Sequence, residues 1–220
     1  MTMNLFRLAG DLSHAASIII LLQRLRTSKS ALGISLKTQE LFLIVFLCRY
    51  LDLFTTFISL YNSVMKVLYI SSTSYIIYMM RMLPTYKATY DKDQDSFLHI
   101  YFAVVPCLVL ALITNLVQGF DFTEMLWIFS IYLEATAIIP QLVVLQRYRE
   151  VENLTGNYVF LLGCYRALYI MNWVYRAYHE AHYRHSYVAY AAGVVQTALY
   201  VDFFYYYALS KAKGGTLIVK

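Results

Sequence analysis

The chain has 220 residues, of which 60% are hydrophobic and 14% are charged, whereas a typical soluble domain has about 45–50% and about 25%. So small a polar fraction cannot cover a water-soluble globule, and a content of 8 Gly and 3 Pro excludes a collagen-like chain. The net charge is +5, but the basic residues do not cluster on one solvated face, so we expect no nucleic-acid partner. We predict an integral membrane protein formed by a single domain over residues 1–220.

Apolar runs long enough to cross the ~30 Å hydrocarbon core as helices recur along the chain. They predict an all-α bundle of seven transmembrane helices with the lipid bilayer as its surroundings. In the first run, Arg7, Asp11 and His14 interrupt the apolar stretch, so it lacks the shape of a signal peptide and should remain as a structural helix. The predicted spans are Leu5–Leu25, Thr38–Ile58, Met65–Met82, Phe97–Val117, Glu124–Leu145, Tyr158–Tyr178 and Tyr187–Leu209.

The distribution of Lys and Arg predicts the orientation of these spans, because cytoplasmic loops of membrane proteins carry the excess of basic residues. Twelve of the eighteen fall in the connections after spans one, three and five and in the tail, and three (Arg7, Lys66 and Arg184) fall on the other side. We therefore predict a luminal N-terminus and a cytosolic tail at about residues 210–220. Asn153-Leu154-Thr155 has the pattern of a glycosylation acceptor, but this orientation makes it cytosolic, and we interpret it as a helix start.

Charged residues within or near the spans are the most informative feature. A charge at bilayer depth costs at least ~2.5–3.5 kcal/mol, so it needs a partner or a water-filled cavity. Two explanations are open: Arg49 and Asp52, spaced i, i+3, could neutralise each other on one helix face, or the charges could line a ligand site. The residues concerned are Asp11, Arg49, Asp52, Glu134, Arg166, Arg176 and Asp202.

The sixth span favours the ligand site. Its polar residues lie at helical spacing and form one stripe, whereas a helix packed only for stability would carry small or apolar residues there. Arginine matches carboxylates with its planar fork, so the pattern predicts an anionic ligand that also carries a cation. The stripe comprises Tyr165, Tyr169, Asn172 and Arg176, with Trp173 beside it.

Other residues can be assigned around this site. Glu124 and Trp127, at the start of the fifth span, could receive the cationic end of the ligand. His14 is either a packing residue or a group that changes charge near neutral pH. A separate histidine group in the predicted luminal loop lacks a carboxylate pattern, so we favour a solvated loop over a metal site; it comprises His179, His182 and His185.

A weak internal repeat suggests two halves. Gly33-Ile34-Ser35 precedes span two and Pro140-Gln141 precedes span six, so spans one to three and five to seven could be three-helix units joined by span four, as in SWEET-type transporters. A SWEET or PQ-loop transporter of a small solute is therefore the alternative function, although a neutral sugar has no use for three arginines. No H-E-x-x-H or G-x-S-x-G motif occurs, and we expect no enzyme, cofactor or metal.

Longer blocks resemble the KDEL receptor family, whose members retain proteins in the endoplasmic reticulum (ER). They extend over nearly the whole chain, and blocks of this length are specific. The blocks are Asn4-Leu5-Phe6-Arg7-Leu8-Ala9-Gly10-Asp11-Leu12-Ser13-His14, Arg49-Tyr50-Leu51-Asp52-Leu53-Phe54, Ser59-Leu60-Tyr61-Asn62, Ala88-Thr89-Tyr90-Asp91, Phe129-Ser130-Ile131-Tyr132-Leu133-Glu134, Tyr165-Arg166-Ala167-Leu168-Tyr169 and Val194-Val195-Gln196-Thr197-Ala198-Leu199-Tyr200 followed by Asp202-Phe203-Phe204-Tyr205.

The resemblance implies a receptor that binds C-terminal Lys-Asp-Glu-Leu or His-Asp-Glu-Leu signals in the acidic Golgi. Coatomer vesicles would return the complex to the ER, where near-neutral pH releases the cargo. Arg49, with Tyr50 close by, would hold the terminal carboxylate of the signal. Arg7 and Arg176 would pair with its Glu and Asp. The residues assigned to signal binding are Arg7, Arg49, Tyr50, Asp52, Glu124, Trp127, Trp173 and Arg176, of which Asp52 and Glu124 would take the cation.

The resemblance also implies a proton-sensing network and a trafficking signal. The network comprises His14, Glu134, Tyr165, Arg166 and Tyr169; trafficking is assigned to Asp202 and to the tail lysines Lys211 and Lys213, which would recruit coatomer. The chain departs from the family at two places. Tyr183-Arg184-His185 stands where members often have an acidic residue, and Gly215 stands where a second tail lysine is common in animal members. The choice between Lys and His in the signal stays open.

Overall fold

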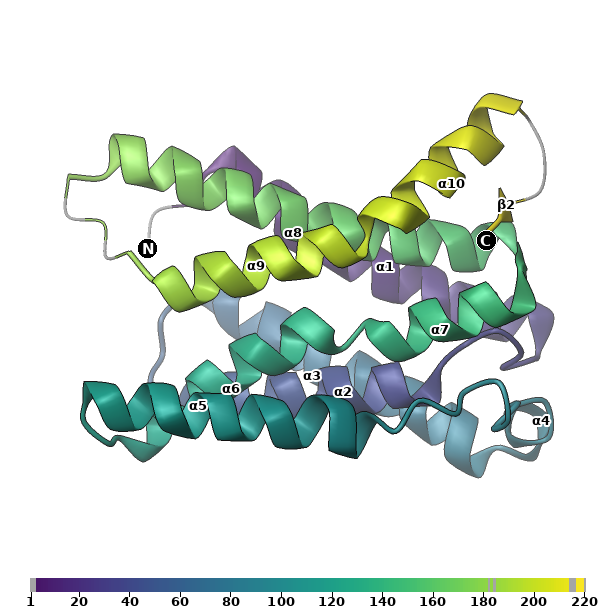
Figure 1. The fold of residues 1–220 in the computed structure, drawn as a ribbon, viewed down its shortest axis with the longest axis horizontal. Helices are drawn as coiled ribbons and strands as arrows, with labels where there is room; N and C mark the ends of the chain where they lie inside the picture. Colours follow the sequence, from purple (N-terminus) through teal and green to yellow (C-terminus); the bar gives the residue numbers. More distant parts are fainter. Residues whose placement is uncertain (1–2, 182, 184, 214–216, 220) are drawn as a thin grey trace. The chain divides into compact units, whose positions relative to one another are not determined.

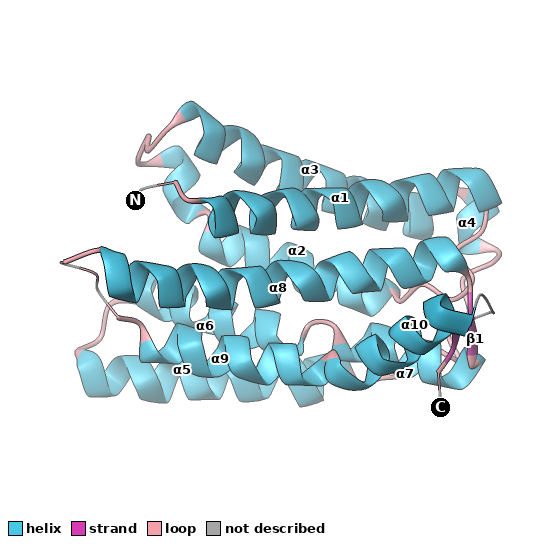
Figure 2. Cartoon of the chain, turned by 90° about the horizontal axis from the view of Figure 1, so that it is seen from above, coloured by secondary structure: helices cyan, strands magenta, loops and turns pink. Residues whose placement is uncertain are grey.

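The computed structural model describes residues 3–181, 183, 185–213 and 217–219. The chain divides into two units, which we call the terminal unit (Met1–Ser28 with Tyr148–Lys220) and the central unit (Lys29–Arg147). Helices make up most of both units, as the coiled ribbons in Figure 1 and the cyan elements in Figure 2 show. The prediction of an all-α protein is therefore confirmed at the level of fold class.

The terminal unit is built on helix α1 (Leu5–Ser28), which packs along α8 (Asn153–His179). Helices α9 (Tyr187–Leu199) and α10 (Val201–Lys213) also pack on α8. The packing is close enough that a Cβ added at Gly10 on α1 would lie 2.9 Å from the Tyr169 ring on α8. The start of α8 at Asn153 agrees with the predicted helix start.

Two short strands close the terminal unit near the end of the chain. Strand β1 (Glu150–Val151) pairs antiparallel with β2 (Leu217–Ile218), so that Glu150 lies opposite Ile218. The Leu217 and Val219 side chains are buried. The end of the predicted cytosolic tail is therefore docked on the protein.

The central unit contains α2 (Leu36–Arg49), α3 (Leu60–Met82), α5 (Val105–Gln118), α6 (Phe122–Thr136) and α7 (Ile139–Tyr148). Shorter elements connect them: the 3-10 helix η1 (Leu51–Phe54), α4 (Pro84–Lys87) and the π-helical turn η2 (Ile100–Val104). Helix α6 packs on α2 and α5, and α3 packs on α2. Leu41, Val45 and Leu133 are fully buried in this core.

The membrane character follows from helix length and hydropathy. Among the described residues, three helical stretches are long and apolar enough to cross a bilayer: Leu5–Ser28, Ile100–Val117, which comprises η2 and most of α5, and Phe122–Tyr148, which comprises α6 and α7. Tyr187–Leu199 is apolar but shorter. The chain therefore has several helices that can span a membrane, as the composition predicted.

Three predicted spans are interrupted instead of continuous. The second span stops at Arg49, continues only as η1 and has no helix over residues 55–59. The fifth breaks between α6 and α7 because Pro140 lacks a backbone N–H and crowds the carbonyl four residues earlier. The seventh breaks at Tyr200, whose N–H bonds the Thr197 carbonyl at 3.1 Å. Only the second of these breaks involves predicted signal-binding residues.

The predicted three-helix halves of the sequence are not confirmed by the division into two units. Helix α1 belongs with α8, α9 and α10, whereas α2 and α3 belong with α5, α6 and α7. The pairing of α1 with α8 includes hydrogen bonds between residues 148 and 158 positions apart in the sequence, which no local pattern indicates.

Candidate functional site

An ion pair on a buried carboxylate of the central unit involves the arginine predicted to hold the ligand carboxylate. Arg49, at the last residue of α2, forms an ion pair through NH1 with Glu134 on α6 and donates from Nε to the Ser130 hydroxyl at 3.1 Å. Glu134 is only 3% exposed. A buried carboxylate needs such a partner because water no longer solvates it. The Arg49 fork is thus oriented by two groups on one helix.

Of the two explanations that the sequence left open, the mutual neutralisation of Arg49 and Asp52 is not the one seen, because each is paired with another charge. Because α2 ends at Arg49, Asp52 lies in η1 and not on the same α-helical face. The Asp52 carboxylate instead accepts a hydrogen bond at 2.6 Å from the ammonium of Lys66 on α3. The two charges that the sequence placed together therefore have different partners.

The other predicted binding residues of the central unit lie near the ends of its helices. Tyr50 caps α2, and its ring stacks on that of Phe46, with centroids 5.7 Å apart. Glu124 is exposed in the first turn of α6, where the helix dipole favours a carboxylate. Trp127, one turn further, is half-buried, and its carbonyl accepts a hydrogen bond from Ser130 at 2.6 Å.

A polar cluster in the terminal unit joins α1 to the predicted stripe on α8. The Asp11 carboxylate accepts a short hydrogen bond from the Tyr169 hydroxyl and lies 4.0 Å from Arg7. Asn4 donates to the Asn172 amide oxygen at 2.7 Å. The stripe thus lies on one face of α8 as predicted, and residues of α1 contact it.

The predicted proton-sensing residues of the terminal unit are in mutual contact. The His14 ring stacks on the Tyr165 ring with centroids 4.3 Å apart and planes at 9°. The Tyr165 hydroxyl accepts hydrogen bonds from Arg166 at 3.1 Å and from Gln196 on α9 at 3.4 Å. His14, Tyr165 and Arg166 are all buried, so a charge change on this histidine would act in a low-dielectric environment.

Arg176 and Trp173 complete the predicted binding residues of the terminal unit. Arg176 forms a bidentate pair with Glu180, with distances of 2.9 and 2.7 Å, and its guanidinium lies 4.5 Å from the centroid of the Tyr183 ring. Trp173 packs against Tyr190 at 5.5 Å between centroids. It also lines an apolar cavity of about 210 Å³ with Ile170, Val174, Ala177, Tyr190 and Val194.

The predicted residues thus form contacts within each unit. In the terminal unit these are Arg7 with Asp11 and Tyr169, His14 with Tyr165 and Arg166, and Trp173 with Tyr169 through a T-shaped ring contact. In the central unit Arg49 contacts Glu134, and Asp52 contacts Lys66. Among the described residues, no hydrogen bond or ion pair joins Glu124 to Asp52, the two residues predicted to share the cation.

The histidines of the predicted luminal loop and the tail residues lie away from these contacts. His179 and His185 are exposed, whereas His182 and Arg184 lie outside the described residues, as does Gly215. No group of three His, Cys, Asp or Glu side chains suited to a metal occurs in the part of the chain that the structure describes. Asp202 is exposed in the first turn of α10, and Lys211 and Lys213 are exposed in its last turn.

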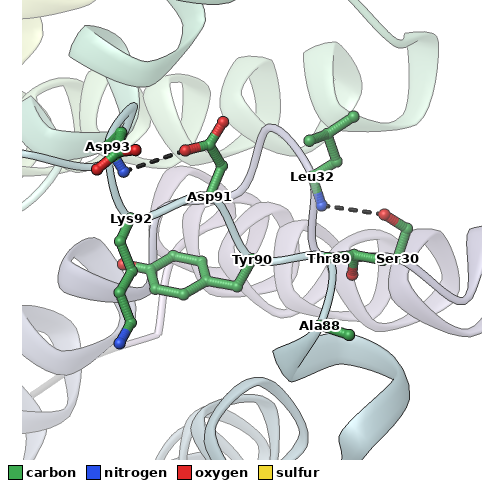
Figure 3. Close-up of a pocket in the computed structure, with 8 residues that line it drawn as sticks. All are labelled: Ser30, Leu32, Ala88, Thr89, Tyr90, Asp91, Lys92 and Asp93. Atoms are coloured by element: carbon green, nitrogen blue, oxygen red, sulfur yellow. Dashed lines mark hydrogen bonds between the residues drawn. The ribbon is translucent and has the colours of Figure 1, made fainter.

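A hollow of about 610 Å³ lies elsewhere on the central unit, in the loops around residues 30–32 and 88–93 (Figure 3). Asp91 accepts a hydrogen bond from the Asp93 backbone at 3.0 Å, and Ser30 accepts one from Leu32 at 3.2 Å. Residues 30–32 precede α2, and the loop after α4 is joined to them by the hydrogen bond from the Ala31 N–H to the Thr89 hydroxyl at 2.9 Å, whereas Arg49, Tyr50 and Asp52 lie at the C-terminal end of α2. The hollow is therefore not the predicted binding site.

A buried carboxylate beside this hollow holds the loop in place. Asp95 is 1% exposed and accepts hydrogen bonds from the Ser35 and Tyr90 hydroxyls at 2.9 and 2.7 Å. Burial first, and the bond to Asp95 second, raise the pKa of the Tyr90 phenol. Tyr90 therefore remains a proton donor well into alkaline pH.

Sequence reasoning missed three partners of the predicted residues: Ser130, Glu180 and Lys66. Lys66 was counted among the basic residues of the other side, because it lies at the very start of the span predicted over Met65–Met82. The missed signal is Ser59, a favoured N-cap residue, whose hydroxyl accepts a hydrogen bond from the Asn62 N–H at 3.2 Å and starts α3 at Leu60. Recognising that cap would have begun the helix at Leu60 and placed Lys66 in its second turn instead of at its first residues.

Comparison with known proteins assigns the family. The sequence model of the family "ER lumen protein retaining receptor" matches residues 30–176. An ER lumen protein-retaining receptor from Petunia hybrida is 56% identical over 205 residues, 93% of this chain and 94% of that protein. Receptor B from Arabidopsis thaliana is 54% identical over 94% of this chain and 95% of its own length. The Drosophila melanogaster receptor is 53% identical over 98% of both chains. At this identity and coverage, the chain belongs to the ER lumen protein retaining receptor family.

Proposed function

We propose that the chain is a Golgi-to-ER retrieval receptor that binds C-terminal KDEL or HDEL signals of luminal proteins at acidic pH and releases them at neutral pH. The observation that carries this proposal is the family membership over nearly the whole chain. The SWEET-type transporter is the weaker candidate, since the relatives reported above bear the name of retention receptors.

Charge supports the choice of ligand. A terminal Lys-Asp-Glu-Leu carries one cationic and three anionic groups near neutral pH. The residues that would bind it include Arg7, Arg49 and Arg176, each already held by a carboxylate of its own unit. Guanidinium groups held in this way are oriented in advance for carboxylates, which lowers the entropy lost on binding.

The Arg49–Glu134 pair suggests how a proton could aid binding. The ligand carboxylate and Glu134 would compete for the same guanidinium. Protonating Glu134 would weaken that pair and leave Arg49 for the ligand, so binding would strengthen at acidic pH. His14, stacked on Tyr165, would add positive charge over the same pH range.

For the membrane arrangement, we propose seven spanning segments with a luminal N-terminus and a cytosolic tail that presents Lys211 and Lys213 to coatomer. The two halves would be three-helix repeats joined by the segment that contains α5. The excess of basic residues after spans one, three and five supports the orientation. Glycosylation acceptors placed at each end in turn test it: sugar on the tail and none on the N-terminus would contradict this topology.

The central experiment measures peptide affinity to the purified full chain at pH about 5.5 and about 7.4. The probe is a labelled peptide that ends in Lys-Asp-Glu-Leu, and its C-terminally amidated form is the control. We expect tighter binding of the free acid at the lower pH. Equal binding of both peptides would exclude Arg49 as the carboxylate ligand, and no binding of either at any pH would exclude the function.

A substitution separates charge from geometry at Arg49. Lysine keeps the charge but loses the fork, so Arg49→Lys should weaken binding nearly as much as Arg49→Ala. Removing one partner of a buried charge pair typically costs ~2–5 kcal/mol of binding. Full affinity in Arg49→Lys would show that a point charge suffices.

A further inference from the structure

The ion pair between Asp52 and Lys66 is the least expected feature of the central unit. The Lys66 ammonium on α3 lies 2.6 Å from Asp52 Oδ2 on η1. The Lys66 side chain is 9% exposed, whereas that of Asp52 is 39% exposed. A lysine so deeply buried is uncommon unless it is paired. Its pairing with Asp52 therefore accounts for its burial.

The surroundings fix the ammonium in this position. The Ser59 cap starts α3 at Leu60 and so places Lys66 in the second turn, next to η1. The ammonium also lies 5.6 Å from the centroid of the Tyr50 ring, within the range of a cation–π contact. Lys66 is therefore held from two sides.

Lys66 leaves Asp52 only partly satisfied. The second carboxylate oxygen, Oδ1, is buried and has no hydrogen-bond partner among the described residues. Asp52 is the residue to which the family resemblance assigns the cation of the signal. The carboxylate that would bind the ammonium group of a ligand lysine is thus already paired with the ammonium group of Lys66.

We propose that Lys66 is a specificity-determining residue that sets how much the receptor gains from a cation at the fourth position from the end of its ligand. This inference rests on the proposed function. The Lys66 ammonium neutralises the charge of Asp52. A ligand cation is therefore attracted to that carboxylate less strongly than it would be if Asp52 had no lysine partner. Without Lys66, the full charge of Asp52 is open to the ligand and discrimination for a cation at this position increases.

The measured quantity is a selectivity ratio: the Kd of a peptide ending in Ala-Asp-Glu-Leu divided by the Kd of one ending in Lys-Asp-Glu-Leu. Methionine is unbranched and close to lysine in length but has no charge. In Lys66→Met the ratio should rise on the order of tenfold over the wild type, because the ligand gains a hydrogen bond to a charged group. Lys66→Arg keeps the charge and should leave the ratio near the wild-type value.

Three further variants complete the test. Asp52→Asn leaves Lys66 uncompensated, which repels a ligand cation and should bring the ratio below the wild-type value. Adding Asp52→Asn to Lys66→Met should abolish the increase. Lys87→Met, an exposed lysine on α4, is the matched control and should leave the ratio unchanged.

The outcomes distinguish this inference from the function on which it rests. If the wild type binds Lys-Asp-Glu-Leu peptide and Lys66→Met has an unchanged ratio, the role of Lys66 is overturned while the receptor function stands. If Lys66→Met does not fold, an unchanged ratio in Asp52→Asn overturns it instead. If the wild type binds neither peptide, both the function and this inference fail.

Discussion

Replacing Arg49 by alanine tests whether the pair with Glu134 stabilises the central unit. The substitution removes the NH1 contact to Glu134 and the Nε hydrogen bond to Ser130. Glu134 is 3% exposed, so its carboxylate would remain buried without a cation. Breaking a buried pair by removing one partner costs about 3–5 kcal/mol.

The expected loss of unfolding free energy can be converted into a shift of the melting temperature. In a chain of this length, 1 kcal/mol shifts Tm by about 2–4 °C, so Arg49→Ala should lower Tm by roughly 6–20 °C. The assay is thermal unfolding of the full chain in detergent without ligand. Because no peptide is present, the result reports on the pair and not on signal binding.

A second Arg–Glu pair of the same unit provides the control. Arg81 donates to Glu40 at 2.6 Å, but its side chain is 55% exposed. Exposed pairs contribute about 0–1 kcal/mol, so Arg81→Ala should lower Tm by at most about 4 °C. If Arg49→Ala lowered Tm no more than Arg81→Ala does, the argument from burial would be refuted.

Three further predictions use other parts of the chain. A Cβ at Gly163 would meet two aromatic rings of the terminal unit, so Gly163→Ala should lower Tm by roughly 2–12 °C, and an unchanged Tm would mean that the rings can move aside. The raised pKa of Tyr90 gives stability that is present below its ordinary pKa of about 10 and is lost as pH rises above it. The Tm difference between wild type and Tyr90→Phe should therefore shrink from pH about 9 to about 11, and a constant difference would contradict the coupling to Asp95. In His14→Ala, peptide affinity should change less steeply with pH than in the wild type, and the slope should fall by up to about tenfold per pH unit. The substitution of the exposed His179 by alanine should keep the wild-type pH dependence. The reverse result would move the proton switch to the loop.

Features that depend on neighbouring residues could be predicted from the sequence. The apolar runs gave helices α1 and α8 with bounds close to those predicted, because length and hydropathy are local properties. The polar stripe on α8 was also predictable, since its spacing follows from the helical period. Membership of a receptor family followed from the conjunction of long sequence blocks.

Only the tertiary structure decided which charge contacts which. Arg49 pairs with Glu134, 85 residues away, and Asp52 pairs with Lys66 instead of the arginine three residues before it. Charge and spacing alone allowed the pair of Arg49 and Asp52, but the end of α2 at Arg49 turns Asp52 onto a different element. The partner of a buried charge is set by the packing of distant helices, because each such charge must find an opposite one where water is excluded.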